Sequence, residues 1–184
     1  MSTQKAGDSF EILGLRLKSP VIVGSGLLSD QPRNIRQLIV HGAAAVVTKT
    51  IFPACRKTHA ERIYSIQTGL LNNTTYSKRP VSEWLVLLSE FKREGLPIIA
   101  SIHARTPQAL GELAAQVAEV SDCPLELGIS CLHADDVEHD TPERVEDYAQ
   151  AVREQTASPF AVKLSLGAQL LERARSAERG GLRR

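Results

Sequence analysis

A thiol and two ammonium groups stand at or near the ends of apolar runs in this sequence. Cys131 closes a run that starts at Pro124, Lys49 closes a second run, and Lys163 lies near the end of a third. Parallel α/β folds place their chemistry at the carboxyl ends of the strands, because the loops there meet at one rim. A thiolate can accept a proton, and a fixed ammonium attracts negative charge. The three residues therefore predict a site for an electron-rich, anionic ligand.

Two connecting segments add candidates to that site. The turn at residues 24–26 has the sequence Gly-Ser-Gly, and its glycines allow either a tight turn or the close approach of a ligand. About thirty residues, 50–81, then separate one expected strand from the next helix, and loops of that length are usually functional or disordered. This segment contains the polar run 72–77, so we expect a lid or a substrate loop here.

The hydrophobic pattern predicts the scaffold that positions these groups. Residues 10–17 are expected to form a small hairpin, and after them five apolar runs alternate with segments of helical periodicity. Such alternation predicts a parallel sheet covered by helices, either an open doubly wound sheet or a (β/α)8 barrel. Five units are too few to close a barrel, and no nucleotide-binding glycine fingerprint or phosphate-loop motif occurs. The pattern therefore predicts an α/β fold of about five parallel βα units preceded by a small β-hairpin, and it leaves the choice between an open sheet and part of a barrel open.

Composition describes an ordinary globular chain. We expect a single domain over residues 1–184, with 1–9 disordered and 176–184 forming a basic tail. Hydrophobic residues make up 42% and charged residues 23% of the chain, and the net charge is +1. This balance implies neither a nucleic-acid partner nor a membrane-surface partner. Within the domain, Asp30 is expected to cap the first helix.

The cysteines and the absence of long apolar segments indicate where in the cell the chain is expected and whether it is expected to bind a metal. Cys55, Cys123 and Cys131 are scattered and odd in number, which favours free thiols in a reducing cytosol. No long apolar run and no basic leader followed by an apolar stretch occur, so the chain is expected to be cytoplasmic. Zinc sites normally contain two pairs of closely spaced ligands. The pairs in this sequence, Cys131 with His133 and Cys55 with His59, do not show that spacing twice, so no metal is expected.

Four segments carry a resemblance to a known family. In order and spacing, LGLRLKSPVIVGSG, AAVVTKT, LELGISC and FAVKLS resemble the first half of class 1 dihydroorotate dehydrogenases. They are also similar to the flavin domain of dihydropyrimidine dehydrogenases. The resemblance covers residues 10–166 and the first five of eight barrel units. It implies a fold of class α/β, an incomplete (β/α)8 TIM barrel of about five parallel βα units preceded by a small β-hairpin, that depends on flavin mononucleotide (FMN).

The resemblance also implies roles for individual residues. Cys131 matches the catalytic base, which takes a proton from one ring carbon while hydride leaves the neighbouring carbon for the flavin. Lys49 matches a lysine that touches flavin and substrate, and Asn72 matches the first residue of the substrate-binding loop. An ammonium at Lys163 stabilises negative charge on the flavin's pyrimidine ring. The residues that match flavin contacts are Gly24, Ser25, Gly26, Lys49, Thr50 and Lys163.

The chain departs from the family pattern at several positions. An Asn that contacts flavin and substrate is replaced by Gly128, and the Pro-Asn that usually follows the second lysine is replaced by Ser165-Leu166. In the substrate loop, Thr75 and Ser77 stand where Gly and Asn are usual. The family's glycine-rich phosphate site lies on strands seven and eight, beyond the five units predicted here.

Two functions follow from these observations. The first is an FMN-dependent oxidoreductase of pyrimidine biosynthesis, which transfers hydride from a dihydropyrimidine to flavin with a cysteine base and is impaired by the missing units. The alternative is a catalytically inactive barrel fragment that assembles with a second copy or a companion chain through its open sheet edges. Without the resemblance, Cys131 could be a core residue, the lysines solvated strand ends, and the glycines turn residues. An open-sheet module for another anionic ligand has no motif in its favour.

Overall fold

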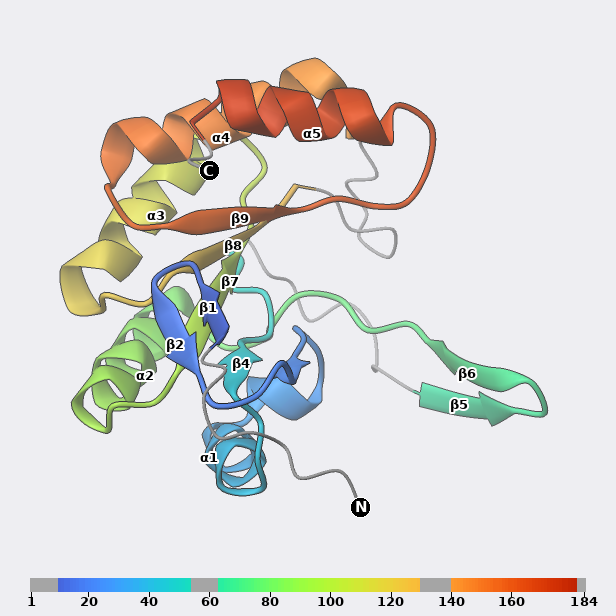
Figure 1. Cartoon of the computed structure of the whole chain (residues 1–184), viewed down its shortest axis with the longest axis vertical. Helices are drawn as coiled ribbons and strands as arrows, with labels where there is room; N and C mark the ends of the chain where they lie inside the picture. The colour runs from blue at the N-terminus through green and yellow to red at the C-terminus, as the bar shows by residue number, and fades with distance from the viewer. Residues whose placement is uncertain (1–9, 54–62, 130–139, 182–184) are drawn as a thin grey trace.

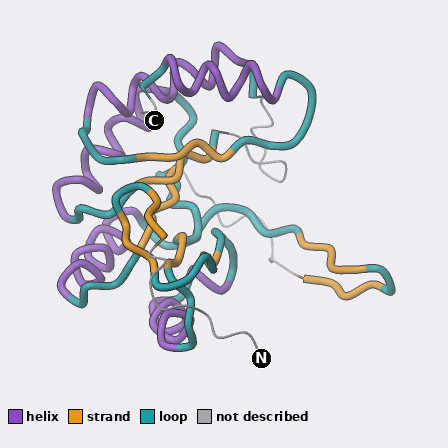
Figure 2. Tube along the Cα trace, viewed as in Figure 1, coloured by secondary structure: helices purple, strands orange, loops and turns teal. Residues whose placement is uncertain are grey.

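The computed structural model of the chain describes residues 10–53, 63–129 and 140–181. Five parallel strands form one sheet in the spatial order β3-β4-β7-β8-β9. The sheet curls into half of a barrel, with helices on its outer side (Figures 1 and 2). The strands are β3 (Ile22–Val23), β4 (Ala45–Val47), β7 (Ile98–Ile102), β8 (Leu125–Gly128) and β9 (Phe160–Lys163). The predicted incomplete TIM barrel is confirmed.

A helix follows each of the five strands. These helices are α1 (Pro32–Val40), α2 (Val81–Arg93), α3 (Pro107–Val120), α4 (Pro142–Gln155) and α5 (Leu170–Arg179). Two begin as the sequence predicts, because Thr106 and Thr141 each cap the first turn with the hydroxyl and precede a Pro at the first helical position. Asp30 does not cap α1. It ends the short 3-10 helix η1 (Leu28–Asp30), and its carboxylate accepts a hydrogen bond from the Ser77 hydroxyl.

The core lies between the sheet and its helices. Ala100 and Ile102 of β7 and Leu125 and Leu127 of β8 pack there against the inward stripes of the helices. In a strand, alternate side chains point to opposite faces. The residues between them, Ser101 and Glu126, therefore point to the concave face of the curl.

The predicted hairpin before the barrel is also present. Strands β1 (Phe10–Ile12) and β2 (Leu15–Leu17) pair antiparallel across a turn at Leu13-Gly14. Leu17 and Ala45 belong to a small second apolar cluster, which attaches this hairpin to the start of β4.

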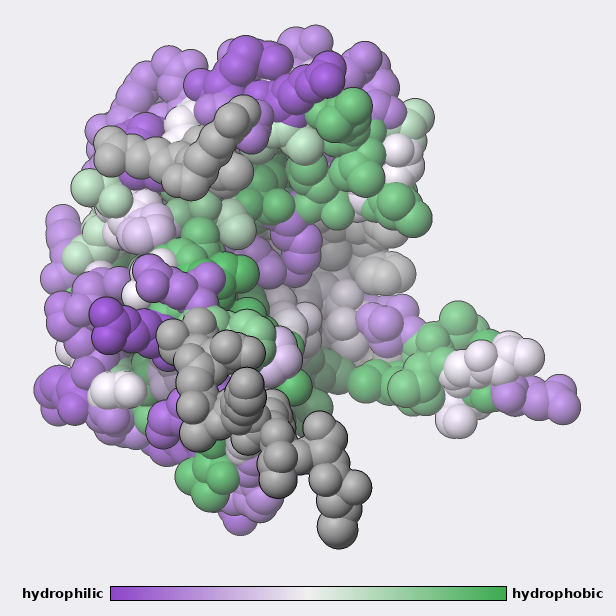
Figure 3. Space-filling view, in the orientation of Figure 1, coloured by the Kyte–Doolittle hydropathy of each residue, from purple (hydrophilic) through white to green (hydrophobic). Residues whose placement is uncertain are grey.

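The long segment after β4 differs from the prediction. Part of it is a second antiparallel hairpin, formed by β5 (Ile63–Ile66) and β6 (Gly69–Asn72), which projects from the body of the protein (Figure 1). This hairpin carries much green, hydrophobic surface in Figure 3. Its exposed large side chains are Ile63, Tyr64, Ile66, Leu70 and Leu71.

The chain also stays helical further than expected at its carboxyl end. Helix α5 reaches Arg179, four residues into the segment 176–184 that is predicted to form a tail. Ser176 and Ala177 are buried, because this last turn packs against the rest of the fold.

Candidate functional site

A line of hydrogen bonds crosses the concave face from one edge of the sheet to the other. The hydroxyl oxygen of Thr50 lies 3.2 Å from that of Ser25 and 2.9 Å from that of Ser101. Ser101 donates to Glu126 Oε1 at 2.9 Å, and Lys163 Nζ donates to the same oxygen at 2.8 Å. We call these five residues the cross-sheet row. The row links the turn after β3 to the last residue of β9, so it fixes the polar side chains on the concave face relative to one another.

Three of the predicted site residues belong to this row: Ser25, Thr50 and Lys163. The two residues that join them, Ser101 and Glu126, were not singled out from the sequence. A signal for them existed, because each is a single polar residue inside an otherwise apolar strand, and such residues are seldom buried without a partner.

Lys49 lies beside Thr50, immediately after β4. Only 3% of its surface is exposed, and its backbone N–H donates to the Ser29 carbonyl at 3.1 Å. Its position on the chain therefore places it at the carboxyl rim, next to the end of the row formed by Ser25 and Thr50.

The predicted catalytic base, Cys131, lies outside the described residues, as do His133, Cys55 and His59. The run that leads to Cys131 is described as far as Ile129, which is fully buried. The meeting of the thiol with the two lysines stays a prediction. In the part of the chain that the structure describes, no three His, Cys, Asp or Glu side chains gather as metal ligands would.

Asn72 is the last residue of β6, and its side chain is engaged locally. Its Oδ1 accepts hydrogen bonds from the Thr74 backbone N–H at 3.3 Å and from the Thr74 hydroxyl at 2.9 Å. This is the side-chain-to-backbone turn that Asn commonly makes in loops. The turn fixes the end of the projecting hairpin.

Ser77 anchors the end of the same segment beside the row. Its backbone N–H donates to the Thr50 carbonyl at 2.9 Å, and its hydroxyl donates to Asp30 Oδ1 at 2.6 Å. The indole N–H of Trp84 donates back to that hydroxyl at 2.9 Å. Ser77, which stands where the family usually has Asn, is thus a buried structural anchor of the loop.

Aromatic rings line the rim between β4 and β7. The His103 ring stacks on Tyr76, with centroids 4.7 Å apart and planes at 17°, and Phe52 packs against both rings. The Nδ1 of His103 lies 2.5 Å from the Gly128 carbonyl oxygen, and because a carbonyl only accepts, the ring nitrogen donates. The stack ties the loop, through Tyr76, to the position where the family's Asn is replaced by Gly128.

The two residues that replace the usual Pro-Asn after Lys163 have different roles. Ser165 donates to Asp140 Oδ2 at 3.4 Å and accepts from Arg173 Nη1 at 3.1 Å, while Leu166 is exposed. Arg173 and Asp140 are buried and face each other at 3.5 Å. This pair attaches the loop that follows Lys163 to α5 and to the start of α4.

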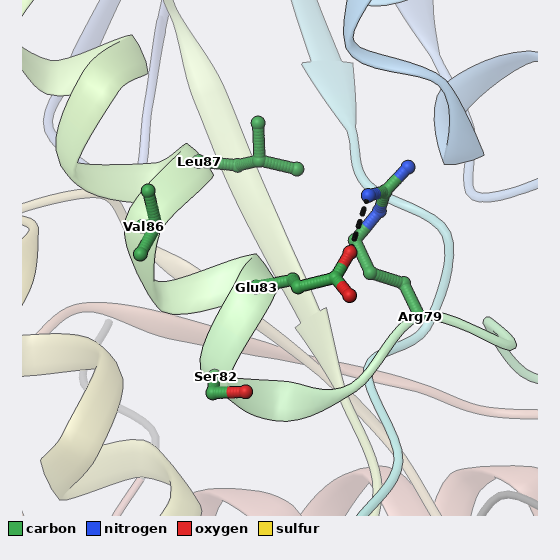
Figure 4. A pocket seen from close by; sticks show the side chains of 5 residues that line it. All are labelled: Arg79, Ser82, Glu83, Val86 and Leu87. Atoms are coloured by element: carbon green, nitrogen blue, oxygen red, sulfur yellow. Dashed lines mark hydrogen bonds and ion pairs between the residues drawn. The ribbon is translucent and has the colours of Figure 1, made fainter.

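A separate pocket lies at the start of α2 and contains none of the predicted site residues. Arg79 reaches across it to the Glu83 carboxylate at 2.8 Å (Figure 4). The lining residues are Arg79, Ser82, Glu83, Val86 and Leu87. The pocket is wide open, and the ion pair of Arg79 with Glu83 is a local contact between the residue before the cap of α2 and its first turn, so we place the candidate site at the cross-sheet row.

Comparison with known proteins confirms the resemblance seen in the sequence. The chain is 33% identical over 160 residues to the dihydroorotate dehydrogenase B (NAD(+)) catalytic subunit of Pyrococcus abyssi, across 84% of this chain and 52% of that protein. The corresponding subunits of Pyrococcus horikoshii and Thermoplasma acidophilum are 32% and 29% identical, and both matches cover 93% of this chain. They cover 57% and 59% of those relatives, so the chain spans somewhat more than half the length of the curated proteins it matches.

Two further comparisons concern family and fold. No family model matches the chain. A crystal structure of HMG-CoA lyase from Brucella melitensis matches with a TM-score of 0.56 at 15% identity, over 84% of this chain and 52% of that one. At this identity the match supports the fold alone. Among the described helices, none is both long enough and apolar enough to cross a bilayer.

Proposed function

Because the chain is related to part of the dihydroorotate dehydrogenase B catalytic subunits, we propose that it is an oxidoreductase barrel of that type. Its concave face takes the ring system of FMN, and its substrate is a dihydropyrimidine. The observation that carries this proposal is the cross-sheet row, which joins Ser25, Thr50 and Lys163, residues that match flavin contacts.

The hydrogen-bonding groups on the concave face are of the chemical types that can bind a flavin ring. A flavin ring presents carbonyl oxygens and ring nitrogens, and the row presents hydroxyls that donate or accept and an ammonium that donates. A Cβ added at Gly24 would meet no atom within 4 Å, so the backbone there is open to close approach.

The chemistry assigned to the chain's own residues is proton transfer and charge stabilisation. FMN, when bound, accepts the hydride. The Cys131 thiolate takes the proton from the neighbouring ring carbon, provided that its pKa lies near neutrality. Lys49 and Lys163 supply fixed positive charge, Lys49 toward both flavin and substrate, and Asn72 with its loop closes on the substrate. The substrate thus loses one proton and one hydride and gains a ring double bond.

Flavin titration tests this proposal. The purified chain is mixed with FMN, and dissociation constants are obtained from the quenching of flavin fluorescence, with Thr50→Val and Lys163→Met as weakened variants. Saturable binding that both substitutions weaken supports the proposal. Flavin fluorescence that is not quenched by excess protein, or variants that bind FMN as the parent does, would overturn it.

The same titration with riboflavin, which is FMN without its phosphate, shows how much of the free energy of flavin binding comes from the phosphate. The family's phosphate site lies on strands seven and eight, whereas the described sheet has five strands. We therefore expect riboflavin to bind within about threefold of FMN, a difference of less than 1 kcal/mol. A preference of about a hundredfold for FMN would contradict this and would mean that the chain holds the phosphate elsewhere.

The open edges of the sheet favour a second candidate function. In the described residues, β3 and β9 are the outer strands, and each pairs on one side only. Unpaired edges are templates for pairing with another chain. A barrel fragment that acts only by assembling with a second copy or a companion chain is therefore the alternative. Light scattering after size exclusion tests assembly of the chain with itself, because a monomer at every concentration would count against a second copy as the partner.

A further inference from the structure

Glu126 accepts two hydrogen bonds at a single carboxylate oxygen. Lys163 Nζ and the Ser101 hydroxyl both donate to Oε1, at 2.8 Å and 2.9 Å. Only 16% of the Glu126 side chain is exposed, against 51% of the Lys163 side chain. The carboxylate is therefore the sheltered partner, and the ammonium is the partner that reaches toward solvent.

This arrangement places negative charge beside an ammonium whose expected task is to stabilise negative charge. A carboxylate inside a sheet is costly to desolvate unless it is paired. Pairing with Lys163 offsets that cost, but it also reduces the positive charge that an anionic ligand would experience. A lysine at this rim could be solvated by water without a carboxylate beside it, so the presence of Glu126 requires a separate reason.

We propose that Glu126 is a positioning residue that aims the Lys163 ammonium and limits its effect on the charge of a bound flavin. The proposal rests on the proposed function, in which Lys163 faces the flavin. The Ser101 hydroxyl holds the carboxylate in place and connects it, through Thr50, to the glycine turn at Ser25. The ion pair thereby connects Lys163 of β9 to the rest of the cross-sheet row.

Two substitutions at Glu126 separate its positioning of the Lys163 ammonium from the effect of its negative charge. Glu126→Gln keeps an acceptor oxygen of similar shape and removes the negative charge, so the charge of Lys163 is no longer offset. Glu126→Ala also removes the acceptor, so Lys163 loses its fixed direction. In the glutamine variant, the reduced, anionic flavin should gain affinity relative to the oxidised flavin. In the alanine variant, both forms should bind more weakly.

The experiment measures the oxidised FMN dissociation constant by fluorescence and the flavin midpoint potential by dye equilibration. Glu126→Gln should raise the ratio of reduced to oxidised affinity by about fivefold, the scale of a partly exposed ion pair. For a two-electron couple, fivefold corresponds to an increase of about 20 mV. The control is Glu146→Gln, which removes a carboxylate paired with Arg179 at 2.7 Å between α4 and α5, and it should leave the potential unchanged.

The test that Glu126 acts through Lys163 is the same substitution in a Lys163→Met background. The shift should be clearly smaller there, because only the direct effect of the Glu126 charge on the flavin remains. A shift of equal size in both backgrounds, no shift at all, or a fall in the potential would each overturn the proposal.

A measurement without flavin keeps this inference separate from the proposed function. If the parent protein binds no flavin, the proposed function fails, and a double-mutant cycle in urea unfolding still tests the pair. Glu126→Gln and Lys163→Met should then be non-additive. Additive effects would show that Glu126 does not hold Lys163.

Discussion

The hydroxyl oxygens of Ser25 and Thr50 lie 3.2 Å apart, although 25 residues separate them in the sequence. Thr50 also meets the Ser101 hydroxyl at 2.9 Å, so its single hydroxyl joins three neighbouring strands of the sheet. A hydroxyl has one hydrogen and two acceptor lone pairs, which is enough for both contacts. Thr50 is therefore the junction between the glycine turn and the rest of the cross-sheet row.

Thr50→Val is the first prediction. Valine keeps the shape of the side chain and removes both hydrogen bonds, so we expect a loss of about 1–2 kcal/mol in the free energy of unfolding. The measurement is urea denaturation followed by circular dichroism. Ser25→Ala, which removes only one of the two contacts, should cost less. Equal losses for the two variants would argue that Thr50 is not a junction.

Ser77→Ala is the second prediction, and it concerns the loop that ends beside Thr50. The Ser77 hydroxyl is fully buried and serves Asp30, the Trp84 indole and the Arg79 backbone N–H. Its removal leaves buried polar groups without this partner, so we expect a loss of about 2–3 kcal/mol in the free energy of unfolding.

The matched control for Ser77 is Ser82→Ala, at an exposed position in the first turn of α2. It should change the free energy of unfolding by less than about 0.5 kcal/mol. If Ser77→Ala were equally mild, the anchoring role of the hydroxyl would have to be abandoned.

The scaffold was readable from the sequence because burial leaves a strong pattern. Every residue of β7, from Ile98 to Ile102, is buried, and a strand buried on both faces is a continuous apolar run apart from Ser101. Trp84, Leu88 and Phe91 of α2 are buried and lie at helical spacing. The alternation of such runs and stripes predicts a parallel α/β sheet without further information.

The hairpin β5–β6 was missed for a physical reason. The stretch has alternating apolar residues and a glycine, which are hairpin signals, but its side chains pack on no core. A pattern that reflects no burial is hard to distinguish from an irregular loop.

The cross-sheet row was missed for another reason. Ser101 and Glu126 stand 25 residues apart, and sequence alone does not say which distant polar residue will be the partner.

The third prediction uses the buried thiol of Cys123, which lies in the core before β8. Burial raises the pKa of this thiol above its ordinary value of 9.0, while the Ser121 hydroxyl opposes the shift. Between pH 9.0 and the higher pKa of the folded state, the unfolded chain binds fewer protons than the folded chain. The contribution of Cys123 to stability is therefore complete well below pH 9.0 and is lost as pH rises past 9.0 and through the folded pKa.

Cys123→Ala removes this titration and leaves the other groups in place. The difference between the unfolding free energies of parent and variant should be constant up to about pH 8.5 and should shrink above it. Urea denaturation at a series of pH values measures the difference. A difference that grows with pH would mean that the thiol ionises more easily in the folded protein than in the unfolded chain.

The fourth prediction restores a side chain that the family has and this chain lacks. A Cβ at Gly128 would lie 3.8 Å from the Ile102 carbonyl oxygen and 3.9 Å from Thr50 Cγ2, which are ordinary contacts. Gly128→Asn should therefore fold, with a change of less than about 1 kcal/mol in the free energy of unfolding. The new amide would point to the concave face beside Thr50 and could donate and accept there.

Flavin binding is the functional measurement for this variant. If the concave face takes the flavin ring, Gly128→Asn should lower the dissociation constant, by about tenfold for one well-placed hydrogen bond. Gly128→Ala is the control for volume without hydrogen bonding, and it should leave the constant unchanged.

Gly111→Ala is the control for steric sensitivity, because its Cβ would lie 2.6 Å from the Ala151 carbonyl oxygen where α3 packs on α4. That variant should be destabilised by about 1–3 kcal/mol. If Gly128→Ala were as damaging as Gly111→Ala, the space over Gly128 would not be available to a side chain, and the loss of the family's Asn would reflect packing.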